Sequence, residues 1–275
     1  MDIQRLAAFS DGQHGGNPAG VVITDELPQT EIMQKIAKDV GYSETAFAQP
    51  IDDGFRVRYF SPLSEVPFCG HATIALGAAL AQAYGDQTFA LSLNEANITV
   101  EGQTDGEKMY ASLQSPPTHS RPLDDRLLTE ALSLFGLRPD DLDPRIPPAF
   151  AHAGANHVVL FLKSRQRLAE LDYSQTLGKV WMDAEQLVTA LLGYIENNQL
   201  FHTRNAFASG GVFEDPATGA ATAALGGYLR DIKWPHGGNI NIVQGEDMGS
   251  RSLLNATFSD EPGSSIRVSG SVRKI

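Results

Sequence analysis

The chain has 275 residues, of which 42% are hydrophobic and 20% are charged. This balance excludes a disordered chain and indicates a soluble globular protein of one or two domains. The net charge of −12 gives no general electrostatic attraction to nucleic acid or to an anionic membrane, so neither is expected as a partner.

Cysteine usage and the first residues limit the chemistry further. The single cysteine excludes an intrachain disulfide, and the histidine spacing does not predict a four-ligand zinc site. Residues 1–5 lack the pattern of a signal peptide, and the chain has no apolar run of about 18 residues that would span a bilayer. We therefore expect a cytoplasmic protein.

The first part of the chain predicts short strands and two helices. Apolar residues at helical spacing predict a helix over 30–40, with Thr30 as its N-cap and Gly41 as its end. An alanine-rich helix is predicted over 71–84, where Gly85 ends it. Strands are predicted at 3–9, 20–24, 42–48, 55–60, 88–93, 97–101 and 108–113.

A break follows, because residues 115–122 and 138–149 are rich in Pro and Asp. We expect one half over 1–115 and a second over 116–275, with the last strand or strands able to cross back to the first half. Helices are predicted at 125–135, 183–192 and 216–230, and strands at 156–162, 199–206, 239–243, 252–258 and 265–273.

A repeat relates the two halves. The segments 70–80 and 219–229 share seven of eleven residues, and the shared positions include Gly, Thr and Leu as well as Ala. Chance similarity between alanine-rich helices is the alternative to a duplication. Small residues on every side of a helix favour burial inside a tight sheet or barrel.

Each repeated helix begins with free backbone amides, which attract anions together with the helix dipole. Glycine at 70 and 219 lets a ligand approach the backbone closely. The matched pair favours binding of a small carboxylate-bearing ligand over ordinary helix capping by Ser, Thr or Asp.

Four residues near these helices are candidates for chemistry. Glu44 lies among small and apolar neighbours, and is either an acid/base group or a surface glutamate at a strand start. His71 either binds a ligand or caps its helix. Asp215 precedes Pro216 in the order of an N-cap and a first helical residue, which does not exclude ligand contact. Cys69 is either a buried cysteine or a thiolate at a helix N-terminus.

Five motifs in register across nearly the whole chain resemble the PhzF-like family of phenazine-biosynthesis-type isomerases. They are Gly16-Asn17-Pro18-Ala19, Ser43-Glu44-Thr45-Ala46-Phe47, Arg56-Val57-Arg58-Tyr59-Phe60-Ser61-Pro62, Glu65-Val66-Pro67-Phe68-Cys69-Gly70-His71-Ala72-Thr73 and Glu214-Asp215-Pro216-Ala217-Thr218-Gly219-Ala220-Ala221. Gln244-Gly245 also fits the family pattern.

The resemblance implies an α+β, diaminopimelate-epimerase-like fold of two pseudo-symmetric halves, each with a sheet or barrel around a central helix, and an active site between them. It implies an isomerase without organic cofactor or metal, and a homodimer. Carried over, Glu44 moves a proton between two carbons of the substrate, with His71 and Asp215 as supporting polar residues. The implied substrate-binding positions are Asn17, Gly70, Ala72, Thr73, Thr218, Gly219 and Ala220.

The resulting hypothesis is a cofactor-independent isomerase of a small carboxylate-bearing metabolite, with Glu44 as general acid/base. Racemases of the related fold use a cysteine pair, which a chain with one cysteine cannot supply. Two alternatives stay open. One is a non-catalytic module that binds a small anion, and the other is single-thiol chemistry at Cys69.

Overall fold

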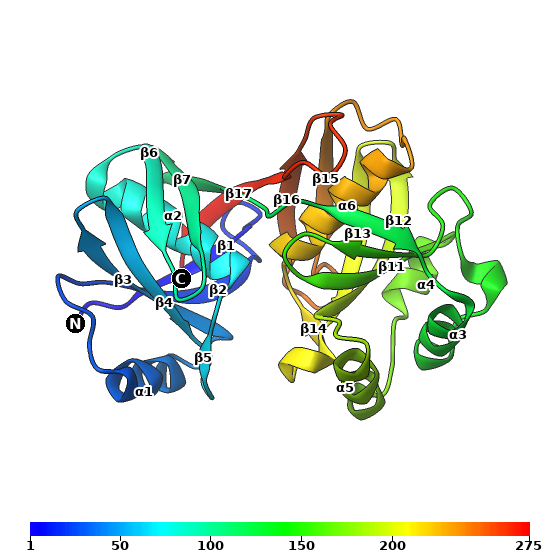
Figure 1. Cartoon of the computed structure of the whole chain (residues 1–275), viewed down its shortest axis with the longest axis horizontal. Helices are drawn as coiled ribbons and strands as arrows, with labels where there is room; N and C mark the ends of the chain where they lie inside the picture. Colours follow the sequence, from blue (N-terminus) through cyan, green and yellow to red (C-terminus); the bar gives the residue numbers. More distant parts are fainter. The chain divides into compact units, whose positions relative to one another are not determined.

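The structure is a computed structural model that describes residues 1–275. Two compact units divide the chain. Unit 1 comprises Met1–Gln114 and Ser269–Ile275, and unit 2 comprises Ser115–Val268 (Figure 1). Each unit has its own sheet and its own buried helix, so each is described by itself.

Unit 1 is a closed sheet around helix α2 (Gly70–Tyr84). The order of pairing is β1, β2, β3, β4, β6, β7, β8 and β17, and β17 pairs with β1 to close the sheet. The strands are β1 (Gln4–Ala8), β2 (Asn17–Ile23), β3 (Glu44–Ile51), β4 (Gly54–Phe60), β5 (Glu65–Val66), β6 (Gln87–Ser92), β7 (Asn97–Asp105), β8 (Lys108–Gln114) and β17 (Arg267–Lys274).

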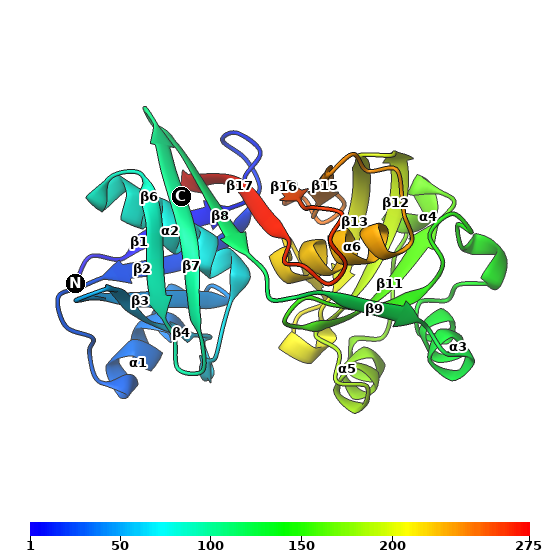
Figure 2. The same ribbon diagram turned by 45° about the horizontal axis from the view of Figure 1, so that its top comes forward.

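Two helices of unit 1 occupy opposite sides of this sheet. Helix α2 is enclosed by strands in both views (Figures 1 and 2), and residues 71–81 are all buried. Helix α1 (Thr30–Val40) packs outside, where Met33 and Ala37 meet Phe47 and Phe60. The difference follows from the sequences, because α1 has one apolar face whereas α2 has small or apolar residues all round.

Small residues let α2 and the sheet approach closely. A Cβ atom on Gly102 of β7 would lie 2.1 Å from the backbone oxygen of Gly77 in α2. Any side chain at position 102 would therefore push the helix away from the strand. A Cβ atom on Gly77 would itself lie 2.5 Å from Cγ2 of Val100, so this glycine in the middle of α2 serves packing, although glycine lowers helix propensity.

Unit 2 arranges its strands around helix α6 (Gly219–Asp231), and residues 221–230 of this helix are buried. Pairing runs β9, β10, β11, β12, β13, β15 and β16. The strands are β9 (His119–Pro122), β10 (Ala149–His152), β11 (Asn156–Leu162), β12 (Thr189–Asn197), β13 (Leu200–Ala206), β14 (Glu214–Asp215), β15 (Asn239–Gln244) and β16 (Ser252–Thr257).

Further helices cover the outer face of the unit 2 sheet (Figure 2). A second apolar core lies beneath them and includes Leu127, Leu168, Met182 and Leu192. The outer elements are α3 (Asp125–Leu134), η1 (Pro139–Asp141), α4 (Arg165–Ala169), α5 (Gln175–Ala184) and η2 (Ala208–Gly210).

The two units share a pattern of strand directions. The pairs β2–β3 and β4–β6 are parallel in unit 1, and the pairs β11–β12 and β13–β15 are parallel in unit 2. The repeated segments 70–80 and 219–229 form the central helices of both units. This architecture confirms the predicted α+β fold of two similar halves around central helices.

Several sequence predictions about local structure are wrong. The predicted helix at 183–192 is the end of α5 and the start of β12, because a buried strand beside β11 is as uniformly apolar as a buried helix. Strand β9 lies within 115–122, which the sequence predicts as a break, and β10 begins at residue 149, where the second predicted break ends. Thr30 is the first residue of α1 rather than its N-cap, which is Gln29.

The start of α6 also differs from the sequence prediction. The helix begins at Gly219 and its N-cap is Thr218, so Asp215 and Pro216 are not the N-cap and first residue. Asp215 instead pairs with Asn205 of β13 as part of strand β14. None of the helices is both long and apolar enough to cross a membrane.

Candidate functional site

Glu44 and His71 meet in unit 1. Glu44 is the first residue of β3, and His71 is the second residue of α2. The Oε2 atom of Glu44 lies 3.4 Å from Nε2 of His71, and the side chains are 16% and 8% exposed. Ser43 Oγ lies 3.3 Å from the same ring nitrogen. A partly buried carboxylate with an imidazole partner is an arrangement that can accept and return a proton.

The first turn of α2 is held by the residues around it. The hydroxyl of Thr73 donates to the backbone oxygen of Cys69 at 2.7 Å, and Tyr59 Oη lies 2.7 Å from Thr73 Oγ1. Burial raises the pKa of the Tyr59 hydroxyl well above its usual value, so this group stays neutral. The Thr73 amide donates to the oxygen of Cys69. Both donors of Thr73 are thus engaged inside the helix.

Cys69 is the N-cap of α2 and is 9% exposed. Its Sγ atom lies 3.4 Å from Nδ1 and 3.9 Å from Nε2 of His71. The thiol and the Glu44 carboxylate therefore lie within reach of one imidazole ring. One ligand atom from each of the three residues lies within 4.8 Å of the others, so this group is also a candidate metal centre.

The other predicted unit 1 residues lie near the same elements. Asn17 is the first residue of β2, is 2% exposed and pairs with Ala8 of β1. Strand β2 runs parallel to β3, with Ala19 opposite Glu44. Gly70 is half-buried and Ala72 is fully buried in the first turn of α2. No side chain accepts a hydrogen bond as a cap of this helix.

Asp215 in unit 2 is the centre of a buried polar network. Its Oδ2 atom accepts a hydrogen bond from Thr218 Oγ1 at 2.5 Å. Gln244 Nε2 donates to the Asp215 backbone oxygen at 2.7 Å and to Thr218 Oγ1 at 2.9 Å. The Thr218 amide donates to Gln244 Oε1 at 3.2 Å. Asp215 is 8% exposed and Gln244 is fully buried.

Gly219 and Ala220 form the first turn of α6, and both are half-buried. No side chain caps this helix either. By contrast, Asp124, Ser164 and Ser174 each cap an outer helix of unit 2 by accepting a backbone hydrogen bond. The two central helices therefore begin without a side-chain cap, whereas these three outer helices each have one.

A buried ion pair supports β14. Arg204 of β13 donates from Nη2 to Glu214 Oε2 at 2.5 Å, and from Nε to Oε1 at 3.0 Å. Arg204 Nη1 donates to the backbone oxygen of Ala169 at 2.8 Å. The Arg204 and Glu214 side chains are 8% and 3% exposed. This pair fixes the residue directly before Asp215.

Ser43, Arg204 and Gln244 are not among the site residues that the sequence predicts. The Gln244-Gly245 pair fitted the family pattern, which was a signal for Gln244, and Ser43 belongs to the same motif as Glu44. Arg204 had no such signal, because its role depends on a strand pairing that spacing does not reveal.

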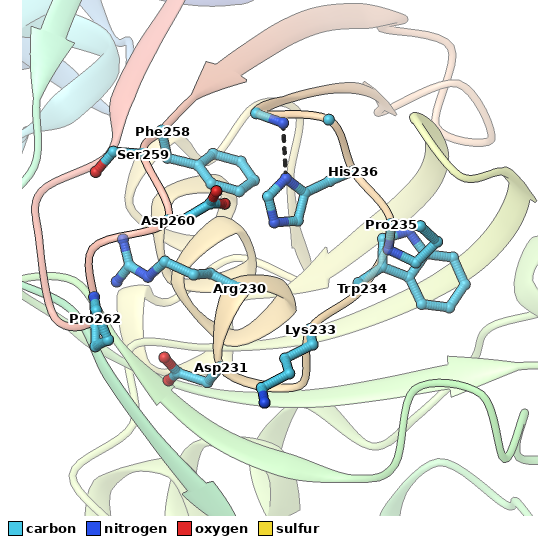
Figure 3. Close-up of a pocket in the computed structure, with 12 residues that line it drawn as sticks. Arg230, Asp231, Lys233, Trp234, Pro235, His236, Phe258, Ser259, Asp260 and Pro262 are labelled. Atoms are coloured by element: carbon cyan, nitrogen blue, oxygen red, sulfur yellow. Dashed lines mark hydrogen bonds between the residues drawn. The ribbon is translucent and has the colours of Figure 1, made fainter.

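Unit 2 also has a surface pocket of about 690 Å³ (Figure 3). Inside it, His236 Nδ1 accepts a hydrogen bond from the Gly238 amide at 2.8 Å. Burial lowers the pKa of His236. None of the predicted site residues lines this pocket, which is formed by Arg230, Asp231, Lys233, Trp234, Pro235, His236, Gly237, Gly238, Phe258, Ser259, Asp260 and Pro262.

Solved structures with a similar fold include isomerases of two kinds. A predicted epimerase from Pseudomonas aeruginosa superposes with a TM-score of 0.85 at 22% identity, over 99% of this chain and 96% of that one. A probable proline racemase from Agrobacterium radiobacter K84 has a TM-score of 0.67 at 11% identity, over 99% and 90%. The fold is therefore epimerase-like.

Sequence comparison identifies the family. Residues 6–273 match the model of the phenazine biosynthesis-like protein family. The uncharacterized isomerase YddE of Escherichia coli O157:H7 is 31% identical, over 98% of this chain and 94% of that protein. Trans-2,3-dihydro-3-hydroxyanthranilate isomerase of Pseudomonas aeruginosa is 30% identical, over 96% and 94%. The chain therefore belongs to the phenazine biosynthesis-like (PhzF) family and is an isomerase.

Proposed function

We propose that this isomerase moves a proton between two carbons of a small carboxylate-bearing metabolite, with Glu44 as the general acid/base and no organic cofactor or metal. The observation that carries the proposal is the 3.4 Å contact between Glu44 Oε2 and His71 Nε2 in a largely buried setting. A single carboxylate can remove a proton from an activated carbon and return it to another carbon on the same face.

In this proposal His71 is a positioning residue. Its imidazole holds the Glu44 carboxylate in one orientation, and the ring itself is fixed by the buried first turn of α2. Cys69 has no part in proton transfer. The chain has no second cysteine that could form the thiol pair of a racemase, and one carboxylate suffices for transfer on one face.

The starts of the central helices supply the proposed carboxylate-binding groups. Their first amides have no partner within the helix, and no side chain caps them. We assign the amides of Gly70 and Ala72, and those of Gly219 and Ala220, to this role. Asn17 and Thr218 are proposed substrate contacts, and Thr73 acts through the helix turn that its hydroxyl stabilises.

Asp215 is the proposed polar positioning residue of unit 2. Its hydrogen bond from Thr218 and the Gln244 contacts hold the carboxylate in one place. Such fixed geometry is what a group that orients a substrate requires. A homodimer is part of the proposal on family grounds, and light scattering on the purified chain tests it.

The experiment is proton exchange in D₂O, followed by NMR of carbon-bound protons. The first compound is trans-2,3-dihydro-3-hydroxyanthranilate, the substrate named for the Pseudomonas relative, followed by other cyclohexadiene carboxylates and amino acids. We expect the wild-type protein to catalyse exchange or isomerisation with one compound, and Glu44→Gln to lose it. Glu107→Gln, at an exposed carboxylate of the same unit, is the matched control and keeps full activity.

Exchange that survives Glu44→Gln contradicts Glu44 as the base and directs attention to Cys69 or Asp215. Saturable binding of a compound without any exchange supports the alternative of a small-anion-binding module. Loss of exchange in Cys69→Ala supports single-thiol chemistry.

A further inference from the structure

Unit 1 contains an ion pair that matches the pair of Arg204 and Glu214 in unit 2. Arg58 Nη2 donates to Glu65 Oε2 at 2.6 Å, and Arg58 Nε donates to Glu65 Oε1 at 2.7 Å. The Nη2 and Nε atoms of Arg204 donate to Oε2 and Oε1 of Glu214 in the same way. Both pairs are therefore bidentate, which is the strong arrangement of an arginine with a carboxylate.

The strand registers show that the two pairs occupy equivalent positions. Glu65 of β5 lies opposite Phe60, the last residue of β4, and Glu214 of β14 lies opposite Ala206, the last residue of β13. Each arginine lies two residues before that strand end, and each glutamate lies five residues before the first residue of its central helix. The pairs are thus part of the same duplication as the helices.

The surroundings of the two pairs differ. Four residues (61–64) separate β4 from β5, whereas seven residues (207–213) separate β13 from β14. The neighbouring cross-strand pair is Tyr59 with Val66 in unit 1 but Asn205 with Asp215 in unit 2. Both units therefore contain the ion pair although the loop and its neighbours have changed. This combination points to a shared requirement, which is to hold the segment that leads into the central helix.

Further contacts connect the unit 1 pair to the elements around it. Arg58 Nη1 donates to Thr30 Oγ1 of α1 at 3.1 Å, and Asn94 Nδ2, in the turn between β6 and β7, donates to Glu65 Oε1 at 2.6 Å. Hydrogen bonds from Arg58 and Asn94 lower the pKa of Glu65, so its carboxylate stays charged. Residues 63, 64, 67 and 68 are exposed, so this segment buries little surface that would hold it otherwise.

We propose that Arg58 and Glu65 are positioning residues, which hold residues 61–70 in place and so preorganise the Gly70 amide for the substrate carboxylate. The role in binding rests on the proposed function, in which this amide binds the carboxylate. The role in holding the segment does not depend on that function. A loose segment would have to become ordered each time a ligand binds, and this cost would weaken binding.

Hydrogen–deuterium exchange of the full chain, followed by mass spectrometry, tests the holding role without an activity assay. In Arg58→Gln and in Glu65→Gln, peptides from residues 61–70 should exchange at least about fivefold faster than in the wild-type protein, because the segment opens more often. Peptides from residues 207–218 form the equivalent segment of unit 2 and should be unchanged. Wild-type exchange of residues 61–70 in both variants overturns the proposal.

Arg58→Lys keeps the positive charge but not the planar fork of the guanidinium, so its exchange rate should lie between those of the wild-type protein and Arg58→Gln. This variant also serves if Arg58→Gln folds poorly. Exchange in Arg58→Lys as fast as in Arg58→Gln supports the bidentate contact, whereas faster exchange at residues 207–218 as well would show general loosening and overturn the proposal.

Steady-state kinetics test the role in binding. If the segment is ordered in only about a tenth of the molecules, KM should rise about tenfold while kcat stays within about twofold. The double variant should have the KM of either single variant, since the two side chains act as one pair. Arg126→Gln removes an exposed arginine that pairs with Glu130 and Glu185 in unit 2, and it should leave KM unchanged.

Additive effects of the two substitutions on KM, or a loss in kcat alone, overturn the role in binding. If the wild-type protein turns over no compound, the proposed function fails. Hydrogen exchange then still decides whether Arg58 and Glu65 hold residues 61–70.

Discussion

The Nε2 atom of His71 lies 3.4 Å from the Glu44 carboxylate, although one residue starts a helix and the other starts a strand. If His71 positions that carboxylate, its replacement should slow proton transfer more than it weakens substrate binding. We expect His71→Gln to lower kcat about 100-fold with little change in KM, within the usual range for acid/base effects. Steady-state exchange kinetics measure this split.

The exposed His14 provides a control, because His14→Gln should leave both parameters unchanged. Thermal denaturation of the two variants shows whether either loses stability. A His71→Gln variant with normal kcat and a raised KM would contradict the positioning role and would favour direct contact with the substrate.

The network around Asp215 should depend on the Thr218 hydroxyl. Thr218→Val removes the donor to Asp215 Oδ2 and the acceptor for Gln244 Nε2. Leaving buried polar groups without a partner should lower the free energy of unfolding by about 1–3 kcal/mol. Urea denaturation measures the loss. Thr218→Ser keeps the hydroxyl and should recover most of the stability, whereas a loss in Thr218→Ser that is absent from Thr218→Val would assign the effect to the methyl group, which valine keeps.

Removing only one partner of the buried pair of Arg204 and Glu214 should lower the free energy of unfolding strongly. Glu214→Ala leaves the guanidinium buried without its carboxylate, and we expect a loss of about 3–5 kcal/mol of unfolding free energy. Asp39→Ala breaks the exposed pair with Lys35 and should cost less than about 1 kcal/mol. Similar losses from the two substitutions, in chemical denaturation, would show that burial of the first pair contributes nothing.

His157 should make the protein sensitive to acid. Its side chain is fully buried, its Nδ1 lies 2.8 Å from Thr189 Oγ1, and burial lowers its pKa from 6.5 to about 3. Between these values the unfolded chain binds a proton that the folded chain does not, so stability falls as the pH falls below 6.5. The contribution is at most about 1.4 kcal/mol per pH unit across this window.

Unfolding free energies measured from pH 7 down to pH 4 test this expectation. His157→Asn should flatten the pH dependence even if it lowers stability at neutral pH, because Asn does not titrate. His119→Asn replaces an exposed histidine and should leave the slope unchanged. An unaltered slope in His157→Asn would mean that other groups control the acid response, including His236, whose pKa burial also lowers.

Local sequence patterns identified the central helices because their composition is unusual. Residues 70–80 and 219–229 have small or apolar side chains on every face, which suits only a fully enclosed helix. The same reasoning failed at 183–192, where a fully buried strand carries no alternation that would distinguish it from a helix. When both faces of a strand are buried, apolar and polar residues no longer alternate along it, and the prediction depends on that alternation.

The same distinction applies to the site: local motifs predict some of its residues, whereas contacts between residues far apart in the sequence determine the others. Motif resemblance selected Glu44 and His71, and the structure brings their side chains together. Spacing alone could not predict the hydrogen bonds of Gln244 to Asp215 and Thr218, because they depend on where β15 ends. The start of α6 was misplaced because Asp215-Pro216 is a common capping sequence, whereas here Asp215 pairs in strand β14.

Strand β17 determines the order in which the chain can finish folding. Unit 2 is continuous in sequence, whereas unit 1 needs Ser269–Ile275 to fill the place between β1 and β8. During synthesis residues 1–114 therefore leave the ribosome before the strand that closes their barrel is made. Until then β1 and β8 have unpaired edges, which are the surfaces most prone to pair with another chain. The nascent protein thus carries its aggregation risk in the half that was made first.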